Sequence, residues 1–193
     1  MAENLQKSNH KNNILIIDDE ANNLEVLSNI LENKGYEVRQ AINADIAFRA
    51  IKIQIPDLIL LDILMPEING YQVCQQLKLN PNTKDIPVIF LSALGRDSDK
   101  AKGFEVGAVD FITKPFHLEE ALARVKHQLT IRKLQLELKQ VNHELSQKNY
   151  RLQAEIYMKQ QAENELKHYQ ALLETRNQEL QAIVADLKNT NKQ

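Results

Sequence analysis

The sequence of 193 residues predicts an α/β fold, in which a five-stranded parallel sheet is covered by helices and followed by a long helical segment. Two observations predict this arrangement. In roughly the first two thirds of the chain, short apolar runs alternate with segments whose apolar residues recur every three or four positions. From residue 116 onward the chain contains neither glycine nor proline, so nothing in its sequence ends a helix.

The predicted strands are short and separated by helical segments. Three of them, the first, third and fourth, are continuous apolar runs, which are typical of strands buried on both faces. Strands that alternate with helices favour a parallel sheet with crossover connections. The five strands are predicted at residues 14–17, 36–40, 58–62, 88–91 and 109–112.

The predicted helices between the strands have recognisable start and stop residues. Gly35 is placed to end the first helix, and Asn43 precedes the second as an N-cap residue. Pro66 and Gly70 bracket the entry to the third helix, and Gly107 is placed to cap the fourth. Each crossover therefore carries one helix.

The C-terminal segment has the heptad pattern of a coiled coil. With Ile131 at position a, apolar side chains fill the a and d positions through residue 187, except at Lys148, Glu155, Lys159 and Arg176. A helix of this length extends about 110 Å at 1.5 Å per residue, so it cannot fold back into the core of a small domain. Its apolar stripe needs a partner, and we expect a homodimer.

These patterns divide the chain into three parts: a disordered lead-in at residues 1–12, an α/β domain at 13–128 and a coiled-coil helix at 129–193, continuous with the last helix of the domain. A net charge of -2 and a pI near 6.2 give no reason to expect nucleic acid or a membrane as a partner. The polar N-terminus and the single cysteine, Cys74, favour a cytoplasmic location.

Polar side chains follow four of the predicted strands where each strand ends. Asp18 and Asp19 follow the first strand, Asp62 ends the third, Ser92 follows the fourth and Lys114 lies just beyond the fifth. The carboxyl ends of parallel strands meet at one edge of the sheet, where ligands bind. Two carboxylates 4 Å apart repel by about 4 kcal/mol at an effective dielectric near 20, so either a carboxyl takes up a proton, which raises its pKa, or a cation binds there. Mg²⁺ suits such oxygen ligands.

The same residue types suit phosphoryl transfer. A carboxylate beside a divalent cation and a lysine can attack phosphorus and form an aspartyl phosphate. The cation and the ammonium then neutralise the phosphoryl oxygens, and a hydroxyl can donate a hydrogen bond to one of them. Asp62, Lys114 and Ser92 are the candidates for these three roles.

Four short motifs together resemble the receiver domain of two-component response regulators, over roughly residues 12–130. They are IIDDE at 16–20, LLDILMP at 60–66, FLSA at 90–93 and DFITKPF at 110–116. The resemblance implies a flavodoxin-like sheet with strand order 2-1-3-4-5 and a cis bond before Pro115. It also implies that a sensor histidine kinase or a phosphotransfer protein supplies the phosphoryl group.

The resemblance further implies a role for each site residue. Asp62 is the expected phosphoacceptor and Lys114 pairs with the phosphate, while Ser92 and Phe111 act as switch residues. Mg²⁺ is expected to be held by Asp18, Asp19, Asp62 and the backbone carbonyl of Leu64.

We therefore expect a response regulator that is not itself an enzyme in the usual sense and that signals through a dimeric coiled coil. Two alternatives remain open. The chain could be the N-terminal input part of a larger hybrid histidine kinase or nucleotide cyclase, or a scaffold whose receiver takes no phosphate.

Overall fold

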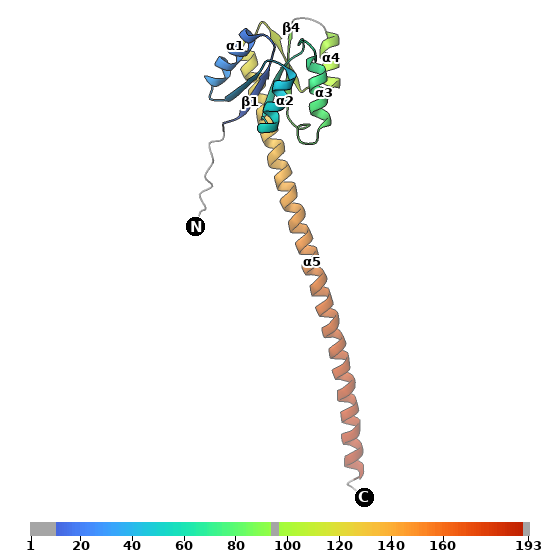
Figure 1. Cartoon of the computed structure of the whole chain (residues 1–193). Helices are drawn as coiled ribbons and strands as arrows, with labels where there is room; N and C mark the ends of the chain where they lie inside the picture. The colour runs from blue at the N-terminus through green and yellow to red at the C-terminus, as the bar shows by residue number, and fades with distance from the viewer. Residues whose placement is uncertain (1–10, 94–96, 191–193) are drawn as a thin grey trace. The chain divides into compact units, whose positions relative to one another are not determined.

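The computed structural model describes residues 11–93 and 97–190 (Figure 1). Residues 1–10 of the expected lead-in and residues 191–193 lie outside the described residues. Strands and helices alternate along the chain. They are β1 (Asn13–Ile17), α1 (Ala21–Glu32), β2 (Glu37–Ala41), α2 (Ala44–Ile53), β3 (Leu58–Asp62), α3 (Gly70–Leu79), β4 (Val88–Ala93), α4 (Asp97–Glu105), β5 (Asp110–Lys114) and α5 (Leu118–Thr190).

The five strands form one parallel sheet in the order β2-β1-β3-β4-β5. The predicted α/β class and the flavodoxin-like strand order are both confirmed. The bond between Lys114 and Pro115 is cis, as the resemblance implied. β5 begins at Asp110 rather than at Val109, although the Val109 N–H still donates to the carbonyl of Val88 at 2.9 Å.

Side chains on the two faces of the sheet feed two separate hydrophobic cores. In β1, Leu15 and Ile17 join the core beneath α2 and α3, while Ile14 and Ile16 join the core beneath α1 and α5. All four are fully buried, which explains why this strand has no polar alternation. Burying each such side chain contributes about 1.5–3 kcal/mol, so the helices of both layers hold the strand ends in place.

Local sequence signals set the helix boundaries. Gly35 and Gly107 adopt φ angles of 87° and 94°, a region that side chains with a Cβ rarely enter. The Asn43 side chain accepts a hydrogen bond from the Ile46 N–H at 2.9 Å, as expected of an N-cap residue. Asn69 caps α3 in a reciprocal capping box, a signal that the sequence interpretation had not used.

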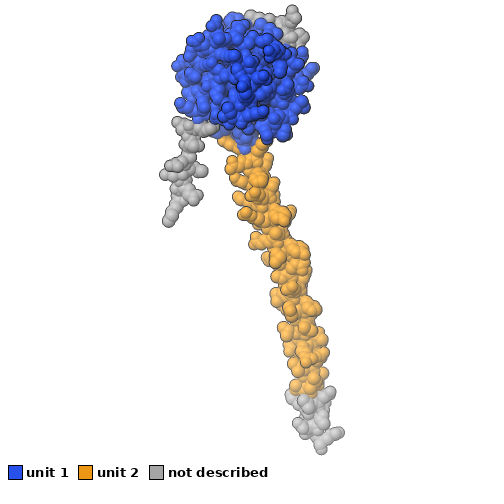
Figure 2. Space-filling model, viewed as in Figure 1, with its two compact units in different colours: residues 1–136 blue, residues 137–193 orange. Residues whose placement is uncertain are grey.

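The chain divides into two compact units, residues 1–136 and residues 137–193 (Figure 2). The second unit contains the C-terminal part of α5. Its apolar heptad positions are largely exposed in the single chain: Leu138 is 61% exposed and Leu166 is 58% exposed. This long helix is consistent with the predicted coiled coil. No helix within residues 11–93 and 97–190 combines the length and apolar character that crossing a membrane requires.

Candidate functional site

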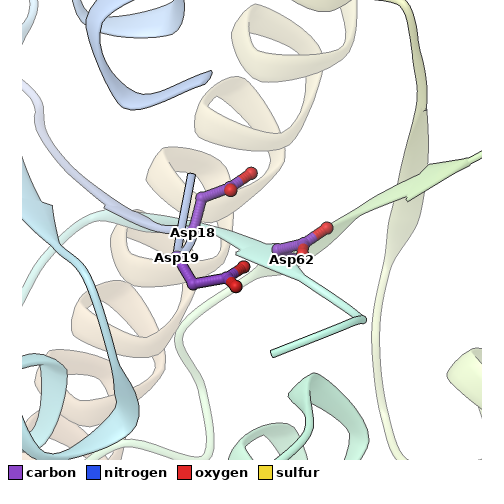
Figure 3. A group of neighbouring side chains, drawn as sticks. All are labelled: Asp18, Asp19 and Asp62. Carbon is purple, nitrogen blue, oxygen red and sulfur yellow. The ribbon is translucent and has the colours of Figure 1, made fainter. Parts of the chain in front are cut away.

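Three carboxylates meet at the carboxyl edge of the sheet (Figure 3). Asp18 and Asp19 directly follow β1, and Asp62 is the last residue of the neighbouring strand β3. One oxygen of each lies within 4.8 Å of the others. Asp18 and Asp62 are buried, whereas Asp19 is exposed, so the cluster opens to solvent on the Asp19 side.

Asp18 is fully buried and well supplied with hydrogen-bond donors. The Glu20 backbone N–H donates to it at 2.9 Å, and the Asn23 side-chain amide donates to both of its oxygens at 3.1 Å. These donors belong to the N-cap residue of α1, Glu20, and to Asn23 in its first turn. They fix the orientation of the carboxylate before any ligand binds.

Lys114 joins the two buried carboxylates. Its Nζ lies 2.9 Å from an oxygen of Asp18 and 2.8 Å from an oxygen of Asp62. Lys114 ends β5, two strands away from β3, so the sheet order is what brings the ammonium to this edge. The ammonium therefore bridges Asp18 and Asp62.

The electrostatics of the cluster perturb the pKa of two groups. Burial raises the pKa of Asp62, and repulsion from Asp18 and Asp19 adds to this, while Lys114 partly opposes it. Burial by itself lowers the pKa of Lys114, but its hydrogen bonds and attraction to Asp62 and Asp18 outweigh burial, so its pKa lies above the ordinary value. Burial is therefore the main reason that the Asp62 carboxyl holds its proton more tightly than usual.

This donor set fits a hard dication. Three carboxylates against one ammonium leave two negative charges uncompensated. Oxygen ligands on one open edge, with room for water on the exposed Asp19 side, match what Mg²⁺ requires. The residues present therefore fit the expected metal.

The segment after β3 folds back onto the end of the strand. The Gly70 N–H donates to the carbonyl of Ile63 at 3.0 Å, which closes the loop that contains Leu64. Leu64 is 74% exposed and lies between the buried residues Ile63 and Met65. The hydrophobic neighbours anchor the loop, and the Leu64 backbone lies two residues beyond Asp62.

The two expected switch residues lie on neighbouring strands. Ser92 is half-buried near the end of β4, one residue beyond Leu91, which is paired in register with Asp62. Phe111 is buried in β5, and its ring centroid lies 5.7 Å from that of Phe90 and 5.0 Å from that of Phe104. Phe111 therefore belongs to the core beneath α2 and α3.

Sequence reasoning missed three residues that shape this edge. Asn23 reads as an ordinary polar residue at a helix start, so its contact with Asp18 had no distinct signal. Gly70 had been used only as a signal of helix entry, and Gly103 had not been considered. A Cβ at Gly70 would overlap the carbonyl oxygen of Asp62, and a Cβ at Gly103 would overlap the ring of Phe111.

Comparison with known proteins agrees with this arrangement. Residues 14–126 match the family described as the response regulator receiver domain. The chain belongs to this family. The receiver match covers the sheet, its crossover helices and the first part of α5, and therefore includes every residue of the acidic cluster and Lys114.

Two curated relatives illustrate the similarity. The chain is 48% identical over 114 residues to the DNA-binding dual master transcriptional regulator RpaA of Synechocystis sp., covering 58% of this chain and 47% of that protein. It is 46% identical over 113 residues to the phosphate regulon transcriptional regulatory protein PhoB of Pseudomonas aeruginosa, covering 58% and 49%. The chain spans about half the length of these relatives.

Two solved structures are also similar to the receiver. A putative response regulator from Chloroflexus aurantiacus matches with a TM-score of 0.61 and 39% identity, over 63% of this chain and 99% of that one. The receiver domain of a signal transduction histidine kinase from Syntrophus aciditrophicus matches with a TM-score of 0.58 and 40% identity, over 62% and 90%.

These relatives correct one expectation. The overall charge of the chain had suggested that nucleic acid is excluded as a partner. That exclusion is wrong, because RpaA, a relative that shares the receiver, is named as a DNA-binding regulator. Net charge averages over a whole chain, whereas nucleic-acid binding depends on local basic surface and on the domain that carries it.

Proposed function

We propose that the receiver accepts a phosphoryl group on Asp62 from a sensor histidine kinase or a phosphotransfer protein. The observation that carries this proposal is the contact of the Lys114 ammonium with both Asp62 and Asp18. A buried carboxylate held beside a lysine and two further acids is an arrangement suited to phosphoryl transfer.

In the proposed reaction, a carboxylate oxygen of Asp62 attacks the phosphorus of a phosphohistidine. The new P–O bond forms as the P–N bond breaks, and the electron pair of that bond returns to the imidazole nitrogen. The Lys114 ammonium exchanges its contact with the Asp62 carboxylate for one with a phosphoryl oxygen, which stabilises the transferred charge. Asp18 keeps Lys114 in place while this exchange occurs.

Mg²⁺ would be held by Asp18, Asp19, Asp62 and the backbone carbonyl of Leu64. When bound, it supplies neutralisation of the phosphoryl oxygens and of the carboxylate repulsion. The three neighbouring carboxylates support this assignment, because one oxygen of each lies within 4.8 Å of the others.

Ser92 and Phe111 are proposed to report phosphorylation. The Ser92 hydroxyl would donate to a phosphoryl oxygen, which draws the end of β4 toward Asp62. Phe111 cannot donate a hydrogen bond, so its response would be a change of ring packing against Phe90 and Phe104. Gly103, which lies on α4, has no side chain and so leaves space for the Phe111 ring.

The output is proposed to pass through α5 to a homodimeric coiled coil. A single helix, Leu118–Thr190, contains both core residues of the receiver and the heptad positions of the second unit. Val125 and Leu129 pack in the core beneath α1 and α5, so a change in that core acts on the same helix that presents the apolar stripe. The protein is proposed to act in the cytoplasm.

A second candidate is that the chain forms the input part of a larger hybrid histidine kinase. The observation that favours it is the similarity to the receiver of a histidine kinase from Syntrophus aciditrophicus. In this case α5 would lead into a kinase module, and the same helix would carry the signal.

Intact-mass spectrometry with a small phosphodonor and Mg²⁺ tests the phosphoacceptor. Wild-type protein should gain the mass of one phosphoryl group, and Asp62→Asn should gain none. Asp57→Asn is the matched control, since Asp57 precedes β3 at its opposite end and accepts a hydrogen bond from the Asn13 N–H. Uptake by Asp62→Asn would overturn the assignment and point to another phosphoacceptor. No uptake by the wild type would favour a silent receiver.

A further inference from the structure

A cavity lies near the amino ends of β4 and β5, whereas the acidic cluster lies at the carboxyl ends of the strands. It has a volume of about 210 Å³ and lies between α5, the end of α3 and the residues that lead into β4 and β5. Pro87 and Val109, which directly precede β4 and β5, are part of its wall. Asp62 and Lys114 end their strands, so the two sites belong to opposite strand ends.

The charge of the cavity wall is mainly positive. Lys78, Lys84 and Arg132 contribute three cations, and Asp85 is the one carboxylate on the wall. The Lys78 ammonium is already oriented, because it donates to the carbonyls of Ile86 at 2.6 Å and Lys84 at 3.1 Å. An ammonium has three N–H donors, so one remains for a ligand.

Two polar side chains of α5, Gln128 and Arg132, also line this cavity. Gln128 lines the cavity and is only 8% exposed. Arg132 donates through Nη1 to the Asp85 carbonyl at 2.7 Å, but its Nε is buried and has no acceptor among the described residues. Buried donors without acceptors are costly and rare in folded proteins.

Gln128 and Arg132 lie four residues apart and therefore occupy one face of α5. The cationic wall, the unpaired Nε of Arg132 and the neighbouring amide of Gln128 suit an acceptor that carries several oxygens and negative charge. We propose that the cavity binds a small oxyanion of the phosphate or sulfate class. Such a ligand would connect α5 to the residues that enter β4, through Arg132, Gln128 and Lys78.

The site is tested with the full-length chain, labelled with ¹⁵N and kept in EDTA so that no metal occupies the acidic cluster. Inorganic phosphate is titrated against chloride at matched ionic strength. We expect saturable shifts in the side-chain amide of Gln128, in Arg132 Nε and in the backbone of Asp85. Sulfate should compete with phosphate for the same shifts.

Two variants and one control decide the outcome. Arg132→Gln and Gln128→Leu should each weaken phosphate binding about tenfold or more, the effect of losing a hydrogen bond to a charged ligand. Lys126→Gln removes one exposed cation from α5 outside the cavity and should leave the affinity unchanged. Circular dichroism checks that each variant is folded. If Arg132→Gln does not fold, Gln128→Leu still tests the site.

Absence of saturable shifts in the wild type would overturn the proposal. So would an equal loss of affinity in Lys126→Gln and Arg132→Gln, because that result would mean that general positive charge attracts the anion. The test does not depend on phosphorylation of Asp62, so its outcome is separate from that of the proposed function.

Discussion

Gly70 lies against the backbone carbonyl of Asp62 so closely that a Cβ at residue 70 would overlap the carbonyl oxygen. The first residue of α3 thus packs directly on the last residue of β3. The loop between them, which contains Leu64, is closed by the hydrogen bond from the Gly70 N–H to Ile63. The position of Asp62, the proposed phosphoacceptor, therefore depends on residue 70 being a glycine.

Gly70→Ala should lower the free energy of unfolding by about 1–3 kcal/mol, the usual cost of forcing an extra carbon into a packed site. It should also slow phosphoryl uptake, because the end of β3 must move. Urea unfolding and intact-mass time courses measure the two effects. Gly35→Ala is the control: space is open there and only its φ of 87° resists a side chain, so stability should fall while uptake stays normal. An unchanged Gly70→Ala protein would contradict the packing argument.

Mg²⁺ should stabilise the protein through the acidic cluster. A ligand that binds only the folded state adds about 2.7 kcal/mol at one hundred times its dissociation constant. We expect a higher melting temperature in Mg²⁺ than in EDTA for the wild type, and little difference for Asp19→Asn. Asp19 is exposed, so its replacement should not disturb folding. Asp45→Asn, an exposed acid in the first turn of α2, should respond to Mg²⁺ like the wild type.

Asp62→Asn should stabilise the metal-free protein at neutral pH. Burial raises the pKa of Asp62, so the native state holds a proton there more tightly than the unfolded chain does. The stability from the protonated carboxyl is present at low pH and is lost as pH rises from the ordinary carboxyl range through the raised native pKa. Asn removes this loss, and we expect a gain of roughly 0.5–2 kcal/mol, a common size for single substitutions.

Urea unfolding in EDTA at several pH values measures this gain. The difference between Asp62→Asn and the wild type should shrink as the pH falls, because the wild-type carboxyl becomes neutral. A destabilised Asn variant at neutral pH would show that the contact with Lys114 outweighs burial.

Cys74 should be protected from alkylation in the folded protein. Burial raises the pKa of its thiol to about 11, so the reactive thiolate is scarce near neutral pH. Above the ordinary thiol pKa the unfolded chain ionises first, and the protein should lose stability as pH rises toward about 11. Iodoacetamide labelling with and without urea tests the protection. Fast labelling of the native protein would mean that α3 opens locally.

Leu145→Lys should weaken the proposed homodimer. Leu145 occupies an a position and is 54% exposed in the single chain, so pairing would bury it once in each copy. Losing about 1.5–3 kcal/mol per copy raises the dissociation constant by about a hundredfold or more. Sedimentation equilibrium measures the change. Ser146→Lys adds the same charge at the neighbouring position outside the seam, and its dissociation constant should stay close to that of the wild type.

The sheet could be predicted from the sequence because several of its strands are continuous apolar runs without polar alternation. Ile14 and Ile16 are indistinguishable in type from Leu15 and Ile17, and this lack of alternation indicated burial on both faces. The acids at the strand ends could be placed on one edge because parallel strands share their direction. The burial of the strands and the position of the acids at their ends can both be inferred from residues that are close together in the sequence.

The remaining features depend on contacts between distant residues. Asn23 and Gly70 shape the acidic cluster through distances that no local pattern shows. Arg132 lies at position b of the heptad register, where the coiled-coil interpretation expects a solvent-facing residue. In the structure its side chain instead contacts the carbonyl of Asp85, because the receiver covers this part of α5.

Phe111 and Ile112 are neighbours in β5 but belong to opposite cores, Phe111 beneath α2 and α3 and Ile112 beneath α1 and α5. A substitution at one of these two positions therefore acts first on one core only. Substitutions around Ile112 and α5 could adapt the receiver to new output helices without rebuilding the ring cluster around Phe111. Consecutive residues of one strand thus contribute to two separate cores, one around the Phe111 ring and one against α5.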